Sequence, residues 1–383
     1  MTSPAPVRRA VAIAGAAAIS RYGATWRGLS RALTDGAPLP GVPAETPLAN
    51  PKARNARKMM SRGAYLAAAA LAELMRDLGW SAEQREGAGY YLGVGASGGS
   101  LDDVTALLDA SIVETASGTR EFSTVAFGEH GLAACNPLLA FQLMNNFTLA
   151  HGAIFEGLGG PNGALFSRGS GTTAALIEAV HAIASGDCDR AIAGGADSAT
   201  HPVTVAELAR ERFTAHGLDA AEGAGLLALV DAAQLASEHA GSDAIDPAPR
   251  SLDVAWHANP MLVTGCAIAS GRGSDLGATI ADAVARAIGA STRSVTDVDV
   301  VVIAAWGPPA VDVSRSWARG HAPQARIVDS AALGATLAAG PALGWIAALD
   351  LLAPGSAARR VLVIDAGVDG DAGAVVFERG GVA

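Results

Sequence analysis

Residues 160–197 read GPNGALFSRGSGTTAALIEAVHAIASGDCDRAIAGGAD. The apolar run at 164–166 predicts a short buried strand, and the glycines after it predict a tight turn, because glycine tolerates backbone angles that other residues avoid. Apolar residues at helical spacing then predict a helix over 172–184, followed by a buried strand over 189–195. A strand, a sharp turn and a helix can present a nucleophile at the positive end of a helix dipole. Here the tip of the turn is Gly169, which has no side chain, so the reactive atom is missing.

The composition is that of a tightly packed α/β protein. Of 383 residues, 50% are hydrophobic, 17% are charged and 46 are glycine, a balance that excludes a disordered chain. The net charge of −10 offers no general basic surface, so we expect no nucleic-acid partner. Glycine and charged residues interrupt every long apolar run, so we expect no membrane span.

The cysteines and the N-terminus indicate the compartment. Cys135, Cys188 and Cys266 are widely spaced and odd in number, which predicts neither a disulfide framework nor a zinc site. A reducing, cytoplasmic location is the expectation. Residues 1–20 superficially resemble a signal peptide, but their apolar run is short, and 11–14 read better as the first buried strand.

Beyond this stretch the chain alternates strand and helix patterns in two similar halves. In the first half we expect helices over 61–78 and 136–155, and strands over 90–94 and 226–230. Residues 232–250 read as a helix and linker between the halves. The second half repeats the order of elements, with strands at 252–255, 298–305, 361–364 and 374–377 and helices at 277–288 and 334–352. This alternation predicts layered α/β packing with buried, parallel-rich sheets.

Residues 93–99 (GVGASGG) satisfy two short motifs at once. GxGxxG is typical of a dinucleotide-binding turn, but this one does not lie in the first βαβ unit. GxSxG, centred on Ser97, is typical of a hydrolase nucleophile elbow, which also needs an Asp and a His downstream. His257 and His321 have no flanking residues that mark them for that role. Both interpretations stay open beside a simpler one, a glycine turn that lines a pocket.

The sequence from Gly160-Pro161-Asn162 to SGDCDRAIAGGADSATHP resembles the nucleophile region of the β-ketoacyl-acyl carrier protein synthases. In that family the turn carries a cysteine that holds the growing acyl chain, and this cysteine aligns with Gly169. The resemblance implies a thiolase-like, five-layer αβαβα fold with two similar halves, residues 1–240 and 250–383. It implies no cofactor.

The resemblance also shows which reacting groups are missing. The family uses two histidines to stabilise an enolate and move protons. The first aligns with Trp306, which can donate one hydrogen bond but cannot accept one. The second aligns with Ala335, and a family lysine aligns with Ser330. Two gating phenylalanines align with Ala366 and Val368.

A ketosynthase frame without these groups resembles the chain-length factor, or ketosynthase β subunit, of type II polyketide synthases. The resemblance implies a heterodimer with a catalytic ketosynthase α subunit, which receives acyl chains from an acyl carrier protein. Glycine at the cysteine position and a shortened loop near residue 215 favour the polyene-forming, highly reducing type. By position, the candidates for the family's tunnel residues are Leu138, Leu139, Phe141 and Met144, and an apolar stripe at this spacing that is plain core is the alternative. The strand from Asn162 to Phe166 is expected to be the central contact with the partner.

Several hypotheses about the vacated site follow from the sequence. Arg168 and Trp306 are candidates to fill the pocket, with Asp365 or Asp369 as partner of the guanidinium; an Arg168 that faces solvent or a dimer partner is the alternative. A local cluster of cations could bind an acidic carrier protein or be a solvated helix end. Its members are Lys52, Arg54, Arg57, Lys58 and Arg62. An acyltransferase using Ser170 or a cysteine, and a homodimeric carrier- or lipid-binding module, also stay open.

Overall fold

The structure, a computed structural model, describes residues 9–36, 51–96, 98–240, 259–271, 275–291 and 293–380. Ten of its strands form one mixed sheet. Five belong to the N-terminal half: β1 (Val11–Ile19), β2 (Gly89–Val94), β5 (Asn162–Phe166), β6 (Arg190–Ser198) and β7 (Glu222–Asp231). Five belong to the C-terminal half: β8 (Met261–Ser270), β9 (Val300–Ile303), β10 (Arg326–Asp329), β11 (Arg360–Ala366) and β12 (Asp371–Arg379). The spatial order is β10-β9-β11-β12-β8-β1-β7-β6-β2-β5.

The two halves of this sheet repeat one plan. Counted along the chain within each half, the strands lie in the order third, second, fourth, fifth, first. The second strand pairs in parallel with the third and fourth, and the fourth pairs antiparallel with the fifth. The halves join where β1 and β8 lie antiparallel, at Ala12 and Leu262. The predicted fold class is confirmed, whereas the predicted boundary between residues 240 and 250 lies outside the described residues.

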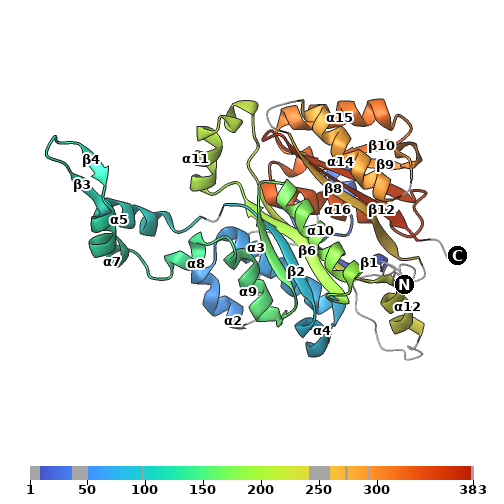
Figure 1. Cartoon of the computed structure of the whole chain (residues 1–383), viewed down its shortest axis with the longest axis horizontal. Coiled ribbons are helices and arrows are strands. Elements are labelled where there is room, and N and C mark those ends of the chain that lie inside the picture. Colours follow the sequence, from blue (N-terminus) through green and yellow to red (C-terminus); the bar gives the residue numbers. More distant parts are fainter. Residues whose placement is uncertain are drawn as a thin grey trace, which may run out of the picture.

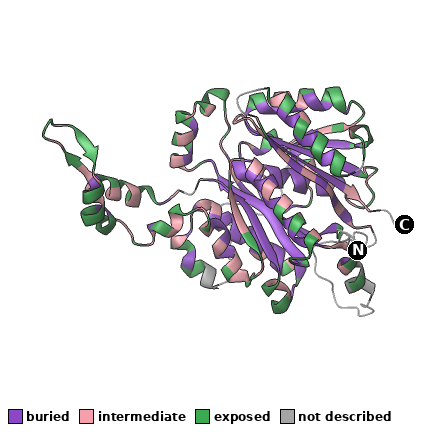
Figure 2. Ribbon diagram, in the orientation of Figure 1, coloured by how far each residue is buried: buried purple, intermediate pink, exposed green. Residues whose placement is uncertain are grey.

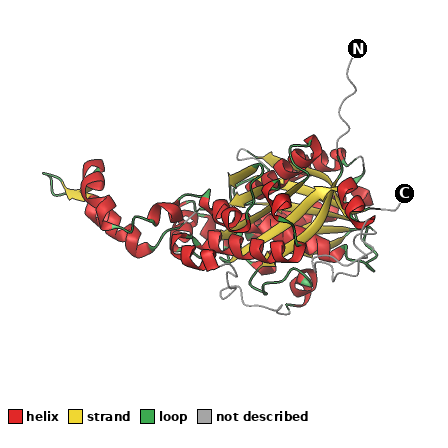
Figure 3. Cartoon of the chain, turned by 90° about the horizontal axis from the view of Figure 1, so that it is seen from below, coloured by secondary structure: helices red, strands yellow, loops and turns green. Residues whose placement is uncertain are grey.

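Helices form the other three layers around the two half-sheets (Figures 1 and 3). The central pair is α10 (Ser170–Ser185) and α16 (Gly340–Leu351), which contact strands of both halves. The outer face of the N-terminal half is covered by α3 (Arg62–Leu78) and α9 (Phe147–Glu156), and that of the C-terminal half by α14 (Leu276–Ala290) and α15 (Pro308–His321). The result is the five-layer αβαβα arrangement.

The sequence of each helix fits its layer. In α16, every residue from Pro341 to Leu349 is buried, and Trp345 is fully enclosed. A helix that is apolar on all sides is stable only between two other layers. By contrast, α3 is buried on all sides from Ala64 to Leu71 and becomes one-sided only in its last turns, where Arg76 is exposed. Its first turn is capped by Ser61, whose side chain accepts a hydrogen bond from the Ala64 amide.

Short helices complete the described structure. They are α1 (Leu29–Asp35), α2 (Pro51–Ala56), η2 (Arg57–Met59), α4 (Ala82–Glu86), α11 (Pro202–Arg210), η4 (Phe213–His216), α12 (Ala232–Ala240), η5 (Val295–Asp297), η6 (Ala331–Leu333) and η7 (Leu337–Ala339). None of the helices among the described residues is long and apolar enough to cross a membrane.

The structure corrects several predicted elements. The helix predicted over 136–155 is broken into α8 (Leu139–Leu143) and α9, because Asn145 and Asn146 form the turn between them. The helix predicted from residue 334 begins only at Gly340, after two 3₁₀ turns. The predicted strand at 252–255 lies outside the described residues, and β8, β10 and α15 are additions that the sequence patterns had not indicated.

An arm projects from the body between β2 and α9 (Figure 1). We define the arm as residues 98–146. It contains α5 (Leu101–Ser111), the hairpin β3 (Ile112–Glu114) and β4 (Arg120–Phe122), α6 (Thr124–Ala126), η3 (Phe127–Gly131), α7 (Leu132–Ala134) and α8. Its outer part is largely exposed (Figure 2), and α5 packs mainly on η3, α6 and α7. The arm therefore extends the molecule without adding to the main core.

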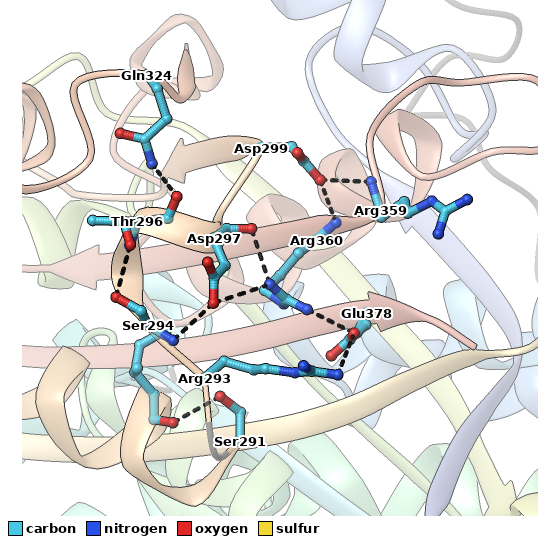
Figure 4. A network of polar contacts seen from close by, with 11 residues as sticks. Ser291, Arg293, Ser294, Thr296, Asp297, Asp299, Gln324, Arg359, Arg360 and Glu378 are labelled. Atoms are coloured by element: carbon cyan, nitrogen blue, oxygen red, sulfur yellow. Dashed lines mark hydrogen bonds and ion pairs between the residues drawn. The ribbon is translucent and has the colours of Figure 1, made fainter. Parts of the chain in front are cut away.

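A polar network fixes the end of the C-terminal half where β9 and β11 begin (Figure 4). Asp299 Oδ2 accepts hydrogen bonds from the backbone amides of Arg359 and Arg360, at 2.7 and 2.8 Å. The buried guanidinium of Arg360 donates to the Asp297 carbonyl at 3.0 Å and to Glu378 at 2.7 Å. These bonds tie the segment before β9 to β11 and β12, at the opposite end of the strands from the candidate site.

Candidate functional site

The turn between β5 and α10 is held by the side chain of Ser167. Ser167 Oγ accepts hydrogen bonds from the amides of Gly169 (3.2 Å) and Gly171 (3.0 Å), and it lies 3.0 Å from Ser170 Oγ. These contacts begin α10 directly after Gly169, which is buried. The amides of the first helical turn carry a partial positive charge. The turn thus has the strand, turn and helix that the sequence predicted. At its tip Gly169 carries only a hydrogen atom in place of a side chain.

Trp306 occupies the space beside Gly169. A Cβ atom added to Gly169 would lie 3.5 Å from Trp306 Nε1 and 3.7 Å from its Cδ1. That is ordinary contact for one carbon, but any larger side chain would meet the indole. Trp306 is 5% exposed and is held at the end of β9 by its amide, which donates to the Ala366 carbonyl at 2.9 Å. A residue of the C-terminal half therefore closes the turn of the N-terminal half.

Ala335 lies in the same small cluster as Trp306. The cluster also contains Leu208 and Leu337, with Phe213 packed against it. Ala335 is 5% exposed, and its backbone bonds the segment before β7 through the Asp219 carbonyl (2.7 Å). The structure thus brings together Gly169, Trp306 and Ala335, three positions that are far apart in the sequence. Ser330 lies buried next to η6, where its hydroxyl donates to the Ile303 carbonyl at 2.8 Å.

Arg168 forms its ion pair with Glu211 and not with either aspartate that was its predicted partner, although its charge also favours the ionised form of Asp369. Its guanidinium forms a two-pronged ion pair with Glu211, with both N···O distances at 2.9 Å. It also lies over the ring of Phe213, 5.5 Å from the centroid, and Phe213 in turn meets Trp306 edge to face at 5.6 Å. The hypothesis that Asp365 or Asp369 pairs with Arg168 is wrong, because Glu211 is nearer. Phe213 and Glu211 were missed because only the tertiary fold places their loop here.

A cavity of about 250 Å³ is lined in part by Trp306. Its lining includes Leu218, Pro308, Arg315 and Ala335 as well as the indole. Trp306 therefore lines this cavity and also contacts the position of the Gly169 side chain, whereas Gly169 is not part of the lining.

Comparison with known proteins identifies the family. Residues 32–229 match the sequence profile of the Beta-ketoacyl synthase, N-terminal domain. The chain belongs to the β-ketoacyl synthase family. No curated protein sequence matches it.

Solved structures of ketosynthases share the fold. The ishigamide ketosynthase/chain length factor superposes with a TM-score of 0.67 at 20% identity, covering 97% of this chain and 100% of that one. A β-ketoacyl synthase from Burkholderia phymatum STM815 gives 0.72 at 18% identity, covering 97% and 99%. A type II polyketide synthase acyl-carrier protein in complex with its ketosynthase bound to the hexaketide gives 0.70 at 13% identity, covering 97% and 99%. Identities this low indicate the fold alone.

This ketosynthase-family chain places three carboxyl groups near the first turn of α10, and of these Asp365 is buried whereas Asp369 and Asp371 are half-buried. Thr173 donates its hydroxyl to Asp365, and Ser170 donates to Asp371 Oδ2 at 3.1 Å. Asp369 Oδ1 is buried with no hydrogen-bond partner. Burial, together with the nearby carboxylates, raises the pKa of Asp365 to about 7 and that of Asp369 to about 6. Asp365 is therefore partly protonated at neutral pH, a property that the sequence had not indicated.

The other candidate nucleophiles are Ser97 and the cysteines. Ser97 lies outside the described residues. The nearby His201 uses both ring nitrogens on the backbone, since Nε2 lies 3.1 Å from the Gly99 carbonyl oxygen and Nδ1 accepts from the Val203 amide at 3.3 Å. Burial raises the pKa of Cys188 and that of Cys266, to about 11 for Cys266, which leaves both thiols protonated and weakly nucleophilic. Among the described residues, no group of three or more His, Cys, Asp or Glu side chains could hold a metal ion.

The predicted tunnel residues lie at the root of the arm. Leu139 is buried in α8 against Gly99, and Leu138 is half-buried. Phe141 packs edge to face on Phe147, with ring centroids 4.8 Å apart, and Met144 is 45% exposed. These four residues thus share one short segment, of which part is already packed against the body.

The predicted interface residues lie on the last strand of the sheet. Asn162 and Phe166 are at the two ends of β5, which has β2 on one side and a free edge on the other within the described structure. Phe166 is 63% exposed. Part of the predicted basic cluster lies next to the arm on α2 and η2, where Arg54, Arg57 and Lys58 are exposed. Arg62 begins α3, is half-buried and pairs with Glu222.

Proposed function

We propose that this chain is a non-catalytic chain-length factor that pairs with a catalytic ketosynthase and shapes its tunnel during polyketide elongation. One observation carries the proposal: Trp306 fills the space beside Gly169, at the position where the family resemblance predicts the nucleophilic cysteine. A condensing enzyme needs a thiolate there to receive the acyl chain. Neither glycine nor the indole can form that thioester.

The groups that would transfer protons during condensation are also replaced. Enolate formation needs groups that accept and return protons beside the reacting carbon. Trp306 has only an N–H donor, and Ala335 has no polar atom. Asp371 accepts from Ser170 and Asp365 accepts from Thr173, so both carboxyl groups are engaged within the structure. The chain therefore supports a structural role better than a chemical one.

The unpaired surfaces support a partner subunit. The free edge of β5, with Phe166 exposed, continues toward the arm, whose apolar side chains face solvent in the isolated chain. Exposed apolar patches of this kind are typical of protein interfaces. We place the catalytic ketosynthase there, and an acyl carrier protein on the complex, where Arg54, Arg57 and Lys58 could contact its acidic surface. Glycine at position 169 and the short loop before β7 support the polyene-forming, highly reducing type.

The test uses the purified chain with and without a catalytic ketosynthase from the same organism that retains the Cys-His-His residues. We expect no extension of an acyl-carrier thioester by the chain alone and extension by the pair. The matched control is the pair in which the partner's nucleophilic cysteine is replaced by alanine, which should abolish the activity. Extension by this chain alone would refute the proposal.

The tunnel role has its own test. Phe141→Ala in the assembled pair should shift the length of the product, because it enlarges the space at the root of the arm. Phe122→Ala, on the outer hairpin, is the matched control and should leave the length unchanged. If the two variants give the same distribution of product lengths, the hypothesis that Phe141 lines the tunnel is rejected.

A second candidate function rests on Ser170. Its hydroxyl donates to Asp371 at 3.1 Å, so a carboxylate is in place to take its proton. In acyl transfer the Oγ would attack a carrier thioester, Asp371 would accept the proton, and the carrier thiol would leave as thiolate. Mass spectrometry of the chain after incubation with an acyl-carrier thioester decides this, with Ser170→Ala as control. An adduct that Ser170→Ala abolishes would favour transfer over the structural role.

A further inference from the structure

The arm combines two properties that rarely occur together on a free surface. Eight of the eleven exposed large apolar side chains of the described residues belong to it. They are Leu101, Leu108, Val113, Phe122, Val125, Leu132, Leu143 and Met144. The arm also carries six carboxylates against one arginine, a formal charge of −5 with histidine neutral. Its surface is both apolar and acidic.

The two kinds of side chain lie side by side. On α5, Leu101, Thr105 and Leu108 follow the spacing of one helix face, and all three are exposed. Asp102 and Asp109 come one position later and so border that face. On the hairpin, Val113 and Phe122 are exposed beside Glu114 and Glu121. Any surface that covers the apolar side chains must also meet the carboxylates.

A second copy of this chain is a poor match for the arm. The whole chain carries −10, so the part outside the arm carries −5 and the second arm another −5. The cluster of exposed cations beside the arm, Arg54, Arg57 and Lys58, holds three charges against the six carboxylates of a second arm. Like charges that an interface brings together and strips of water repel strongly.

We propose that the arm docks on an apolar, lysine- and arginine-rich surface of a different protein chain, and that its carboxylates exclude a second copy. This deepens the proposed function, on which it rests, by stating what surface the ketosynthase partner presents to the arm. The apolar residues provide the buried contact area. The charges select the partner and speed its association.

The test compares two triple variants that remove the same charge. Asp109→Asn, Glu121→Gln and Glu129→Gln neutralise exposed carboxylates of the arm. Asp35→Asn, Glu86→Gln and Asp187→Asn neutralise exposed carboxylates of the body. Each variant is analysed alone by sedimentation at low and high salt, and its affinity for the catalytic ketosynthase is measured over the same salt range.

We expect the arm variant to bind the ketosynthase about tenfold or more weakly than wild type at low salt and to show a shallower salt dependence. Alone, it should self-associate at low salt, where wild type and the body variant do not. Equal affinities and equal salt slopes for the two variants would overturn the inference and leave the proposed function standing. Failure of all three proteins to bind the ketosynthase would reject the proposed function and the inference with it. A tight wild-type homodimer at low salt would also overturn the inference.

Discussion

The two halves of the molecule share one strand order but differ in what joins the second strand to the third. In the C-terminal half residues 304–325 make this connection, and α15 is their only long element. In the N-terminal half residues 95–161 make it, and they include the arm. Because the C-terminal half completes its sheet without such an insert, the arm serves something other than the fold. Its exposed surface in Figure 2 agrees with a role toward another molecule.

The fourth strand of each half, β6 in the N-terminal half and β11 in the C-terminal half, carries a buried aspartate. Near its end β6 carries Asp197 and β11 carries Asp365, both fully buried. Asp197 accepts from the amides of Ser198 and Ala338, whereas Asp365 accepts from Thr173. Burial raises the pKa of each to about 7. The two halves thus place matching acids on either side of the central helix α10.

The largest expected effect separates the shared core from the arm. Trp345→Ala, in the fully enclosed centre of α16, should lower the free energy of unfolding by about 3–5 kcal/mol, because it leaves a large cavity between the sheets. Phe122→Ala, on the exposed hairpin, should change it by no more than about 0.5 kcal/mol. Urea unfolding of the purified variants measures both. A large decrease in the free energy of unfolding for Phe122→Ala would show that the arm contributes to the stability of the core, contrary to the difference drawn between the halves.

A pH series tests the paired aspartates. The pKa of Asp365 is higher in the folded state than in the unfolded state, so the folded protein binds more protons. Stability is therefore greatest at low pH and is lost as pH rises from about 4, the ordinary value for Asp, through about 7. For one such group the loss between pH 5 and 8 is on the order of 2 kcal/mol.

Asp365→Asn should remove this loss, and Asp197→Asn should do the same for the other half. Urea midpoints from pH 5 to 8 measure the difference between each variant and wild type, which should grow with pH. A constant difference for one variant alone would mean that the two acids are not equivalent. A constant difference for both would place their pKa values in the ordinary range.

The sequence allowed the central elements to be predicted, and the reason is local. Residues 160–197 alternate apolar strands and a helix with clear periodicity, so β5, β6 and α10 followed directly. The predicted burial of the strand at 164–166 is wrong, because β5 lies at the edge of the sheet and none of its residues is buried. The break at Asn145 and Asn146 was missed because apolar spacing continues across it. The start of α15 was missed although Pro308 follows Gly307, a recognised helix start. Contacts between loops, such as Phe213 with Trp306, depend on the tertiary fold and have no local signal.

The third prediction concerns the junction of the halves at Gly169. Gly169→Cys should cost about 1–3 kcal/mol, since its sulfur would press on the indole of Trp306. In a Trp306→Ala background the same change should cost much less, with an interaction energy of at least about 1 kcal/mol. Urea unfolding of the four proteins of this cycle gives the value. Additive effects would show that the indole does not limit the space at position 169.

The smallest effect tests how Arg168 supports this junction from the N-terminal half. Arg168→Ala removes the ion pair with Glu211 and the contact with Phe213, and it should cost about 1 kcal/mol, because both charged side chains remain partly exposed. Arg286→Ala removes an exposed pair with Asp282 and should cost no more than about 0.5 kcal/mol. Arg168→Lys should recover only part of the loss, since lysine keeps the charge without the planar group that stacks on Phe213. If Arg168→Ala has no larger effect than Arg286→Ala in urea, Phe213 holds Trp306 in place without the arginine.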